Sequence, residues 1–294
     1  MSKPQQGILA PVPSHGRHLF FDIDRAEALP ATLRRFADMS DGLQIVTGLG
    51  LPLVHTLGRR LDGLHTFPAF SGAGFSIPST PAALWCWLRA EDPGELVHRA
   101  MQLEDTLEPA FYLRQSIEVF RYGSGRDLTG FEDGTENPEG DEAVAAAITH
   151  GKGKGLDGGS FVAVQQWLHD LYRFGSLPEQ QQNDIIGRRK SDNEELENAP
   201  VSAHIKRTAQ EDFDPEAFVL RRSMPWSDPR HAGLVFVAFG KSLDAFEALL
   251  KRMTGAEDGV TDALFSFTRP LTGAYFWCPP MRGEKLDLSA VGLN

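Results

Sequence analysis

The chain has 294 residues, of which 41% are hydrophobic, and a formal net charge of −11 at pH 7. This length suggests two domains or one large one, with enough apolar residues for a sizeable core. The acidic balance argues against nucleic acid or an anionic membrane surface as partners, and no apolar run is long enough to span a bilayer.

The N-terminal segment MSKPQQGILAPVPSHGRH lacks the charged start and the apolar core of an export signal, so we expect a cytoplasmic protein. The two cysteines, Cys86 and Cys278, form no CxxC pair. They are expected to be buried thiols rather than a disulfide or a zinc site.

The first half of the chain has the pattern strand, helix, strand, strand, helix, strand. The strands are expected at residues 17–23, 43–49, 83–88 and 111–122, and the helices at 24–39 and from 92 onward. Asp24 and Asp92 are candidate N-caps of the two helices, and Pro93 suits a first helical position.

The second half repeats this order with different residues. Strands are expected at 160–171, 234–239 and 274–278, and helices at 178–188 and 243–253. The repeat predicts an α+β fold of two tandem ferredoxin-like modules, with antiparallel β-sheets flanked by helices. We place the modules at residues 1–130 and 160–294, with a glycine-rich connecting loop at 131–159 that also contains a short helix at 141–148.

The segment GFEDGTENP at residues 130–138 opens this connecting loop. Glycines let the backbone approach a ligand closely, and an acid held in a loop on a rigid scaffold is typical of a catalytic site. An exposed turn has a similar composition, because Asp-Gly and Asn-Pro are common turn dipeptides. The segment alone therefore does not decide between a catalytic loop and a turn.

His204 differs from the other histidines in its setting. It follows a polar, acidic loop at residues 190–201, with Arg207 three residues later and the pair Arg221-Arg222 further on. A solvated histidine beside a basic surface patch is the simpler interpretation. The combination also suits haem, which needs one imidazole on the iron, cations for its propionates and a polar group on the opposite face.

These segments together resemble the dye-decolorizing peroxidases. GFEDG at residues 130–134 is similar to the GxxDG signature of that family, and the positions of His204 and Arg221 fit its proximal histidine and distal arginine. The opening segments at 6–9 and 18–21 and the aromatic run at 267–277 also look like the family's. The resemblance covers essentially the whole chain, and its compact length is like that of the short bacterial type-B members.

The resemblance implies a haem-dependent peroxidase that reduces hydrogen peroxide and oxidises dyes, phenols or other aromatic electron donors. It implies one haem b per chain, held mainly by the C-terminal module, and a homo-oligomeric state. His204 would be the axial iron ligand through Nε2, with Asp133 and Arg221 on the distal side. Ser223 stands where other members place Asn, and a shift of one residue would exchange Arg221 for Arg222.

The resemblance also implies further contacts with haem. The backbone of Gly134, Thr135, Glu136 and Asn137 would lie against the haem edge, and Arg207 would be a propionate partner. Asp262 resembles the family's proximal acid, which accepts a hydrogen bond from the second nitrogen of the ligating imidazole. Asp262 is equally well placed to be a helix N-cap, because it precedes an apolar run.

In the expected mechanism, Asp133 transfers the peroxide proton and Arg221 stabilises the developing charge. A carboxylate base predicts an acid-shifted optimum, because carboxyl groups ordinarily titrate below imidazoles. Bulky donors are expected to react at the haem edge or through surface aromatic residues, with Trp226 as the first candidate. The acidic surface also offers carboxylates for Mn²⁺, without a distinct cluster.

Two alternatives stay open at this point. The first is a haem-handling protein that binds, transfers or removes iron from haem with little peroxidase turnover, because it needs the same axial histidine. The second is a haem-free ferredoxin-like enzyme or binding module with a carboxylate site. An absorption spectrum after haem is supplied distinguishes the second from the other two.

Overall fold

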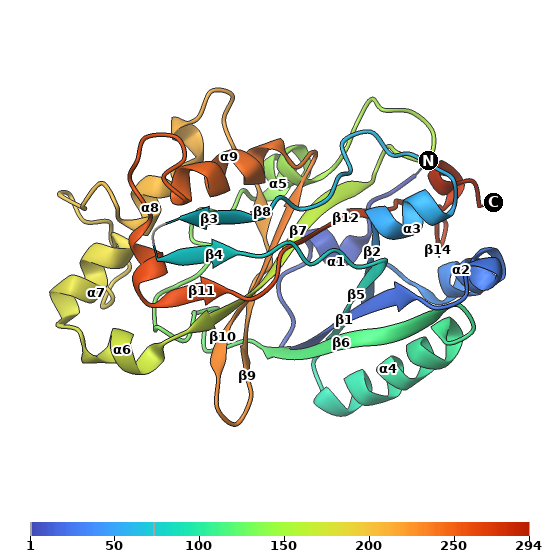
Figure 1. The fold of residues 1–294 in the computed structure, drawn as a ribbon, viewed down its shortest axis with the longest axis horizontal. Coiled ribbons are helices and arrows are strands. Elements are labelled where there is room, and N and C mark those ends of the chain that lie inside the picture. Colours follow the sequence, from blue (N-terminus) through green and yellow to red (C-terminus); the bar gives the residue numbers. More distant parts are fainter. Residues whose placement is uncertain (1, 73, 294) are drawn as a thin grey trace.

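A computed structural model of the chain describes residues 2–72 and 74–293. Its centre is a ten-stranded sheet in which every strand pair is antiparallel, with helices packed on its outer side (Figure 1). This arrangement confirms the predicted α+β fold class.

The first half of the chain contributes four strands, in the sheet order β6-β1-β5-β2. They are β1 (His15–Ile23), β2 (Ile45–Gly50), β5 (Leu84–Ala90) and β6 (Phe111–Phe120). The second half repeats this order as β12-β7-β10-β8. Its strands are β7 (Ser160–His169), β8 (Leu220–Arg221), β10 (Ala232–Gly240) and β12 (Ala274–Cys278), with β9 (Met224–Ser227) beside β10 and β11 (Thr268–Pro270) beside β7.

The two halves share one continuous sheet, because β2 pairs with β12 through Leu49 and Trp277. The far edge strand β6 lies against β9, so the sheet curves back on itself. Strand β5 shows the result: its Leu84, Cys86 and Leu88 belong to the outer core, while Trp85 and Trp87 belong to the enclosed one. A strand buried on both faces reads as a continuous apolar run, which is why this strand was evident in the sequence.

Helices cover the outer face. The longer ones are α2 (Leu29–Met39), α4 (Pro93–Leu107) and α9 (Asp244–Met253). The shorter ones are α1 (Gln6–Leu9), α3 (Leu51–Thr56), α5 (Gly140–Ala147), α6 (Leu171–Ser176), α7 (Glu179–Ile186) and α8 (His204–Arg207). Of these, α1 and α5 lie on the other side instead and pack in the enclosed core, through Ile8 and through Ala143 and Ala147. The structure also contains two small hairpins that the sequence did not predict. One pairs β3 (Phe70–Gly72) with β4 (Phe75–Ile77), and the other pairs β13 (Met281–Arg282) with β14 (Lys285–Leu286).

The two predicted N-caps have different outcomes. Asp92 accepts a hydrogen bond from the amide of Gly94 and caps α4, with Pro93 at the first helical position, as predicted. The prediction for Asp24 was wrong: a 3₁₀ turn at Ala26–Ala28 intervenes, and α2 begins only at Leu29 without a side-chain cap. A local pattern of apolar residues does not separate a 3₁₀ turn from the first turn of an α-helix.

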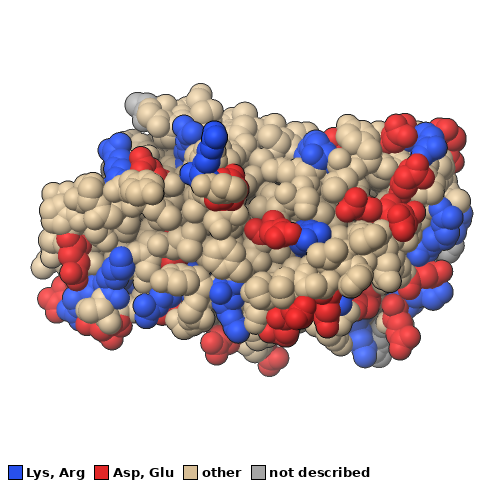
Figure 2. Space-filling model, turned by 90° about the horizontal axis from the view of Figure 1, so that it is seen from below, with Lys and Arg blue, Asp and Glu red and all other residues tan. Residues whose placement is uncertain are grey.

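Both cysteines are buried and free, as predicted. No helix in the described part of the chain is long and apolar enough to cross a membrane. On the face seen in Figure 2, acidic and basic side chains are interspersed.

Candidate active site

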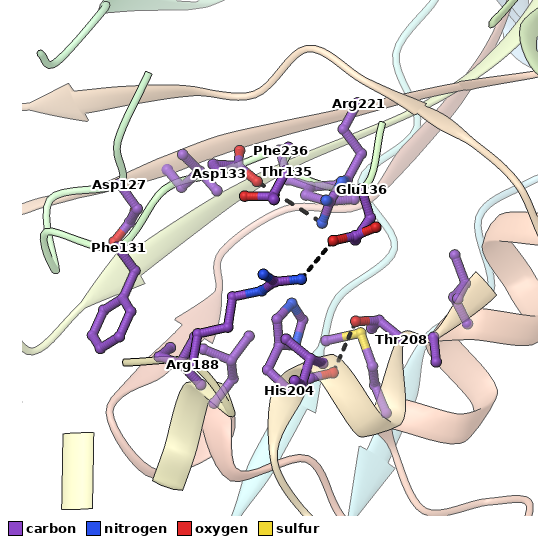
Figure 3. A pocket seen from close by; sticks show the side chains of 18 of the residues that line it. Asp127, Phe131, Asp133, Thr135, Glu136, Arg188, His204, Thr208, Arg221 and Phe236 are labelled. Atoms are coloured by element: carbon purple, nitrogen blue, oxygen red, sulfur yellow. Dashed lines mark hydrogen bonds and ion pairs between the residues drawn. The ribbon is translucent and has the colours of Figure 1, made fainter. Parts of the chain in front are cut away.

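A cavity of about 390 Å³ lies between the connecting loop, the sheet and helices α8 and α9 (Figure 3). The connecting loop contributes residues 131–136, and Asp127 and Thr129 come from the segment before it. Strand β7 contributes Gln165, Trp167 and His169, and α9 contributes Phe246, Leu249, Leu250 and Met253. Segments far apart in sequence thus form a single enclosed space, with polar groups on the loop side and apolar groups on the side of α9.

His204 begins α8 and is one wall of this cavity. Its Nδ1 donates a 2.8 Å hydrogen bond to Oδ2 of Asp262, a carboxylate that is only 1% exposed. The other oxygen, Oδ1, accepts from the amide of Leu264 at 2.8 Å and caps a 3₁₀ turn. One oxygen of Asp262 therefore contacts His204 and the other caps the turn, while the described residues leave the Nε2 of His204 without a hydrogen-bond partner.

Asp133 and Arg221 lie together on the loop side of the cavity (Figure 3). Oδ1 of Asp133 and Nη1 of Arg221 are 3.9 Å apart, and both side chains are about one-fifth exposed, at 22% and 19%. Asn137 fixes this arrangement, because its Oδ1 accepts from the amide of Arg221 and its Nδ2 donates to the carbonyl of the same residue. Gly134 is required in the turn: its φ is +77°, and a Cβ there would lie 2.6 Å from Nδ2 of Asn137.

The choice between Arg221 and Arg222 follows from the geometry of β8. Arg221 lines the main cavity, whereas Arg222 lines only a smaller cavity behind Asp133. Ser223 and Asn137 also line the smaller cavity and do not reach the main one. Thr135 and Glu136 do line the main cavity, as the sequence led us to expect.

Arg207 is not where the sequence placed it. Its guanidinium is 5% exposed, pairs with both carboxylate oxygens of Asp258 at 2.7 and 2.8 Å, and donates to the carbonyl of Arg252. Arg207 does not line the cavity, because its guanidinium is held by Asp258 and by the carbonyl of Arg252 at the end of α9. The expectation that it faces a propionate is not met.

Arg188 is the cation that sequence reasoning missed. It lies two residues after the end of α7, lines the cavity and pairs with Glu136 at 2.5 Å (Figure 3). It also pairs with Glu195 at 2.9 Å. The loop after it is held to the motif by a second contact, from Nδ2 of Asn193 to the hydroxyl of Thr135. Nothing in the local sequence separates Arg188 from other cations near a helix end.

A second missed group is the pair Asp127 and His169. Nε2 of His169 contacts Oδ2 of Asp127 at 3.0 Å, and Nδ1 contacts the hydroxyl of Thr268 at 2.6 Å. Burial acts to raise the pKa of Asp127, but hydrogen bonds from His169 and Thr129 and the charge of His169 outweigh it, and the pKa is lowered. The signal was present in the sequence, because Gln165, Trp167 and His169 alternate along one strand and share the face that lines the cavity.

Two further side chains are occupied elsewhere. Glu132, next to Asp133, accepts hydrogen bonds from Arg126 and Ser124, which lower its pKa although burial acts in the opposite direction. Trp226 is buried and donates from Nε1 to the carbonyl of Trp167. Trp167, rather than Trp226, lines the cavity.

Known proteins resemble this chain over most of its length. Residues 124–283 match the family model described as Dyp-type peroxidase, C-terminal. The chain is 32% identical over 246 residues to a dye-decolorizing peroxidase of Rhodococcus erythropolis, covering 81% of this chain and 72% of that protein. It is 30% identical over 252 residues to a dye-decolorizing peroxidase of Mycobacterium tuberculosis, covering 83% of this chain and 75% of that protein.

Solved structures show the same likeness. The dye-decolorizing protein from V. cholerae has a TM-score of 0.80 and 27% identity, covering 93% of this chain and 96% of that one. A DypB variant from Rhodococcus jostii RHA1, in complex with heme, has a TM-score of 0.82 and 26% identity, covering 92% and 94% of the two chains. The chain therefore belongs to the dye-decolorizing, or Dyp-type, peroxidase family.

Proposed function

We propose that this chain is a haem-dependent peroxidase that reduces hydrogen peroxide and oxidises aromatic one-electron donors. The observation that carries the proposal is the geometry of His204, whose Nδ1 is held by the buried carboxylate of Asp262 while the ring forms a wall of the cavity. A buried acceptor of this kind fixes the tautomer and the orientation of a metal-ligating imidazole, with Nε2 as the ligating atom.

The residues of the cavity fit haem b. Leu249, Leu250 and Met253 offer an apolar wall beside His204, which suits the face of a macrocycle. Lys206 and Arg188 also line the cavity and would be the cations for carboxylate groups at the cofactor's edge, where Arg188 would exchange its contacts with Glu136 and Glu195 for the cofactor. In this proposal Arg188 takes the role that the sequence assigned to Arg207, and the backbone of residues 134–136 lies along the edge of the ring.

Asp133 and Arg221 are proposed to act on peroxide. The Asp133 carboxylate accepts the proton from one peroxide oxygen and returns it to the other, so that water leaves. Arg221 stabilises the negative charge that develops on the departing oxygen, and it does so best in a site that excludes bulk water. Haem, when bound, supplies the redox centre that takes up the oxidising equivalents of peroxide and passes them to the donor.

Ser223 has no direct role toward peroxide in this proposal, although the sequence analysis placed it on the distal side, because it lines the smaller cavity. Its hydroxyl accepts a long hydrogen bond from the amide of Val237 at 3.4 Å. One haem per chain, the homo-oligomeric state and the module boundaries at residues 130 and 160 stay predictions. Donors too large for the cavity are proposed to react at its mouth or through Trp167.

An absorption spectrum tests the proposal directly. The purified chain is supplied with haem, and the Soret band is recorded for the wild type and for His204→Ala. We expect a Soret band in the wild type that shifts rapidly on adding stoichiometric peroxide and that is altered or lost in the variant. A Soret band that His204→Ala leaves unchanged would overturn the assignment of the axial ligand. A normal band that does not respond to peroxide would favour the haem-handling alternative.

A further inference from the structure

A second cavity, of about 150 Å³, lies directly behind the Asp133–Arg221 pair. Asp133, Gly134, Arg221 and Leu234 line both this side cavity and the main one, so they form the partition between the two. The outer rim of the side cavity is made by exposed residues of the segment before the motif: Arg121, Tyr122, Ser124 and Arg126. The side cavity therefore extends from solvent to the Asp133–Arg221 pair.

The lining of the side cavity carries an excess of positive charge. Four arginines line it, at positions 121, 126, 221 and 222, against a single carboxylate, that of Asp133. Arg126 is paired with Glu132 at 2.7 Å, and Arg221 lies 3.9 Å from Asp133. Arg121 donates to the hydroxyl of Ser14. Three of the four arginines thus have a side-chain partner.

Arg222 is the exception. Within residues 2–72 and 74–293, no carboxylate oxygen lies within 4 Å of its guanidinium, which donates hydrogen bonds to the carbonyl oxygens of Leu9 and Arg221. Its Nε is buried without a hydrogen-bond partner. A guanidinium has five N–H donors, so three of them have no protein acceptor. Burial, reinforced by the nearby charge of Arg89, lowers the pKa of Arg222 to about 10.

The two carbonyl contacts explain how Arg222 ties the N-terminal segment to β8, but they leave its charge uncompensated. A half-buried cation with no counter-ion and a second cation close by is an unfavourable arrangement. An anion in the adjoining cavity would supply both the missing charge and the missing acceptors. The hydroxyl of Ser223 lines the same cavity and offers one further donor.

We propose that the side cavity binds a small monoanion, of the class of formate or nitrite, on the guanidinium of Arg222. The volume suits an anion of a few heavy atoms together with its remaining water. The carboxylate of Asp133 at the inner end disfavours dianions and any anion that reaches too far inward, because like charges repel at short distance. The bound anion lies behind the residues proposed to act on peroxide, so its occupancy is coupled to the charge of Asp133.

The test uses the haem-free chain, so that its result does not depend on the proposed peroxidase function. Formate is titrated calorimetrically in a zwitterionic buffer without chloride, and the melting temperature is followed in parallel. We expect saturable binding to the wild type, weakened about tenfold or more in Arg222→Met and largely retained in Arg222→Lys. Arg230→Met, on the exposed turn between β9 and β10, is the matched control and should bind as the wild type does.

Two further variants keep the proposal testable if Arg222→Met folds poorly. Asp133→Asn removes the one competing carboxylate, so formate should bind several-fold more tightly. Arg188→Met should leave formate binding unchanged, because Arg188 lines only the main cavity. The proposal is overturned by the absence of saturable binding to the wild type, by equal affinity in wild type and Asp133→Asn, or by a loss of affinity that follows Arg188 instead of Arg222.

Discussion

The imidazole of His204 and the carboxylate of Asp262 form a 2.8 Å hydrogen bond between positions 58 residues apart in the sequence. The same carboxylate caps the 3₁₀ turn that begins after it, through its other oxygen. The hydrogen bond to the backbone therefore fixes the carboxylate of Asp262, and the fixed carboxylate in turn orients the imidazole of His204. Orientation of the proposed axial ligand depends on a residue that never touches the cavity itself.

Asp262→Asn isolates the charge of this contact. Asparagine retains an oxygen that can cap the turn at Leu264, so the fold should persist, but it presents no carboxylate to Nδ1 of His204. We expect haem affinity or peroxidase activity to fall about 10–100-fold, the usual cost of losing such a partner. Haem titration and peroxide kinetics measure this, with thermal unfolding as the check on folding. Unchanged haem affinity and activity would show that the hydrogen bond serves only the fold.

Asp133→Asn and Arg221→Leu separate proton transfer from charge stabilisation. Removing the acid should slow the reaction with peroxide by about 10²–10⁴-fold, and removing the cation by about 10²–10³-fold. Stopped-flow spectra of the haem-loaded variants give both rates. The control is Glu132→Gln, which alters the neighbouring acid that Arg126 and Ser124 already occupy. If Asp133→Asn reacts at the wild-type rate while Arg221→Leu does not, the proton moves through water that Arg221 orients.

Asn137 positions Arg221 through two main-chain hydrogen bonds, so Asn137→Ala should displace the guanidinium without removing it. We expect a loss of about 1–3 kcal/mol in the free energy of unfolding and a slower reaction with peroxide. Urea unfolding and stopped-flow kinetics measure the two effects. Ser223→Ala is the control in the same cavity wall, and we expect it to change both quantities less. Equal effects of the two substitutions would contradict a positioning role for Asn137.

Arg188 and Arg207 should respond differently to the same substitution. Arg207→Met should lower the free energy of unfolding by about 1–3 kcal/mol, because it breaks the buried contacts with Asp258 and Arg252. Once folded, that variant should bind haem normally. Arg188→Met should weaken haem binding by about tenfold or more through the loss of a charged hydrogen bond. A folded Arg207→Met protein with weak haem binding would return the propionate role to Arg207.

The buried imidazole of His18 should make the free energy of unfolding depend on pH. It is fully buried, stacks with Trp85 and Trp87, and accepts a hydrogen bond on Nδ1 from Trp85. Burial lowers its pKa from 6.5 to about 3. Between pH 6.5 and about 3, His18 is protonated in the unfolded chain but stays neutral in the folded chain. Stability should therefore fall as the pH drops from 6.5 toward 3, by up to about 1.4 kcal/mol per pH unit from this group alone.

Urea unfolding at a series of pH values checks this linkage. His18→Leu should show a shallower loss of stability in acid than the wild type, although it leaves the indole of Trp85 without its acceptor. His150→Leu, at an exposed loop position, should keep the wild-type slope. A slope that His18→Leu leaves unchanged would show that another buried group controls the acid limit.

The sequence by itself determined the features that depend on local patterns. Residues 84–88 of strand β5 form an uninterrupted apolar run because both faces of the strand are buried. Asp92-Pro93 marks the start of α4 because capping is decided within one turn. The segment at residues 130–134 and the setting of His204 were sufficient for the family resemblance, whereas the catalytic role of Asp133 stays a proposal. The strand and the helix start could be predicted because the interactions that form them act between residues that are neighbours in the chain.

The tertiary structure alone decided which side chains face the same space. It turned Arg207 toward Asp258, brought Arg188 into the cavity in its place, and put Ser223 and Arg222 in the side cavity. It also allowed Asp262 to be both a cap and the partner of His204. A side chain's direction depends on how its element is rotated against the rest of the core, and contacts from distant segments set that rotation. Residue type and spacing in the sequence therefore do not predict this rotation.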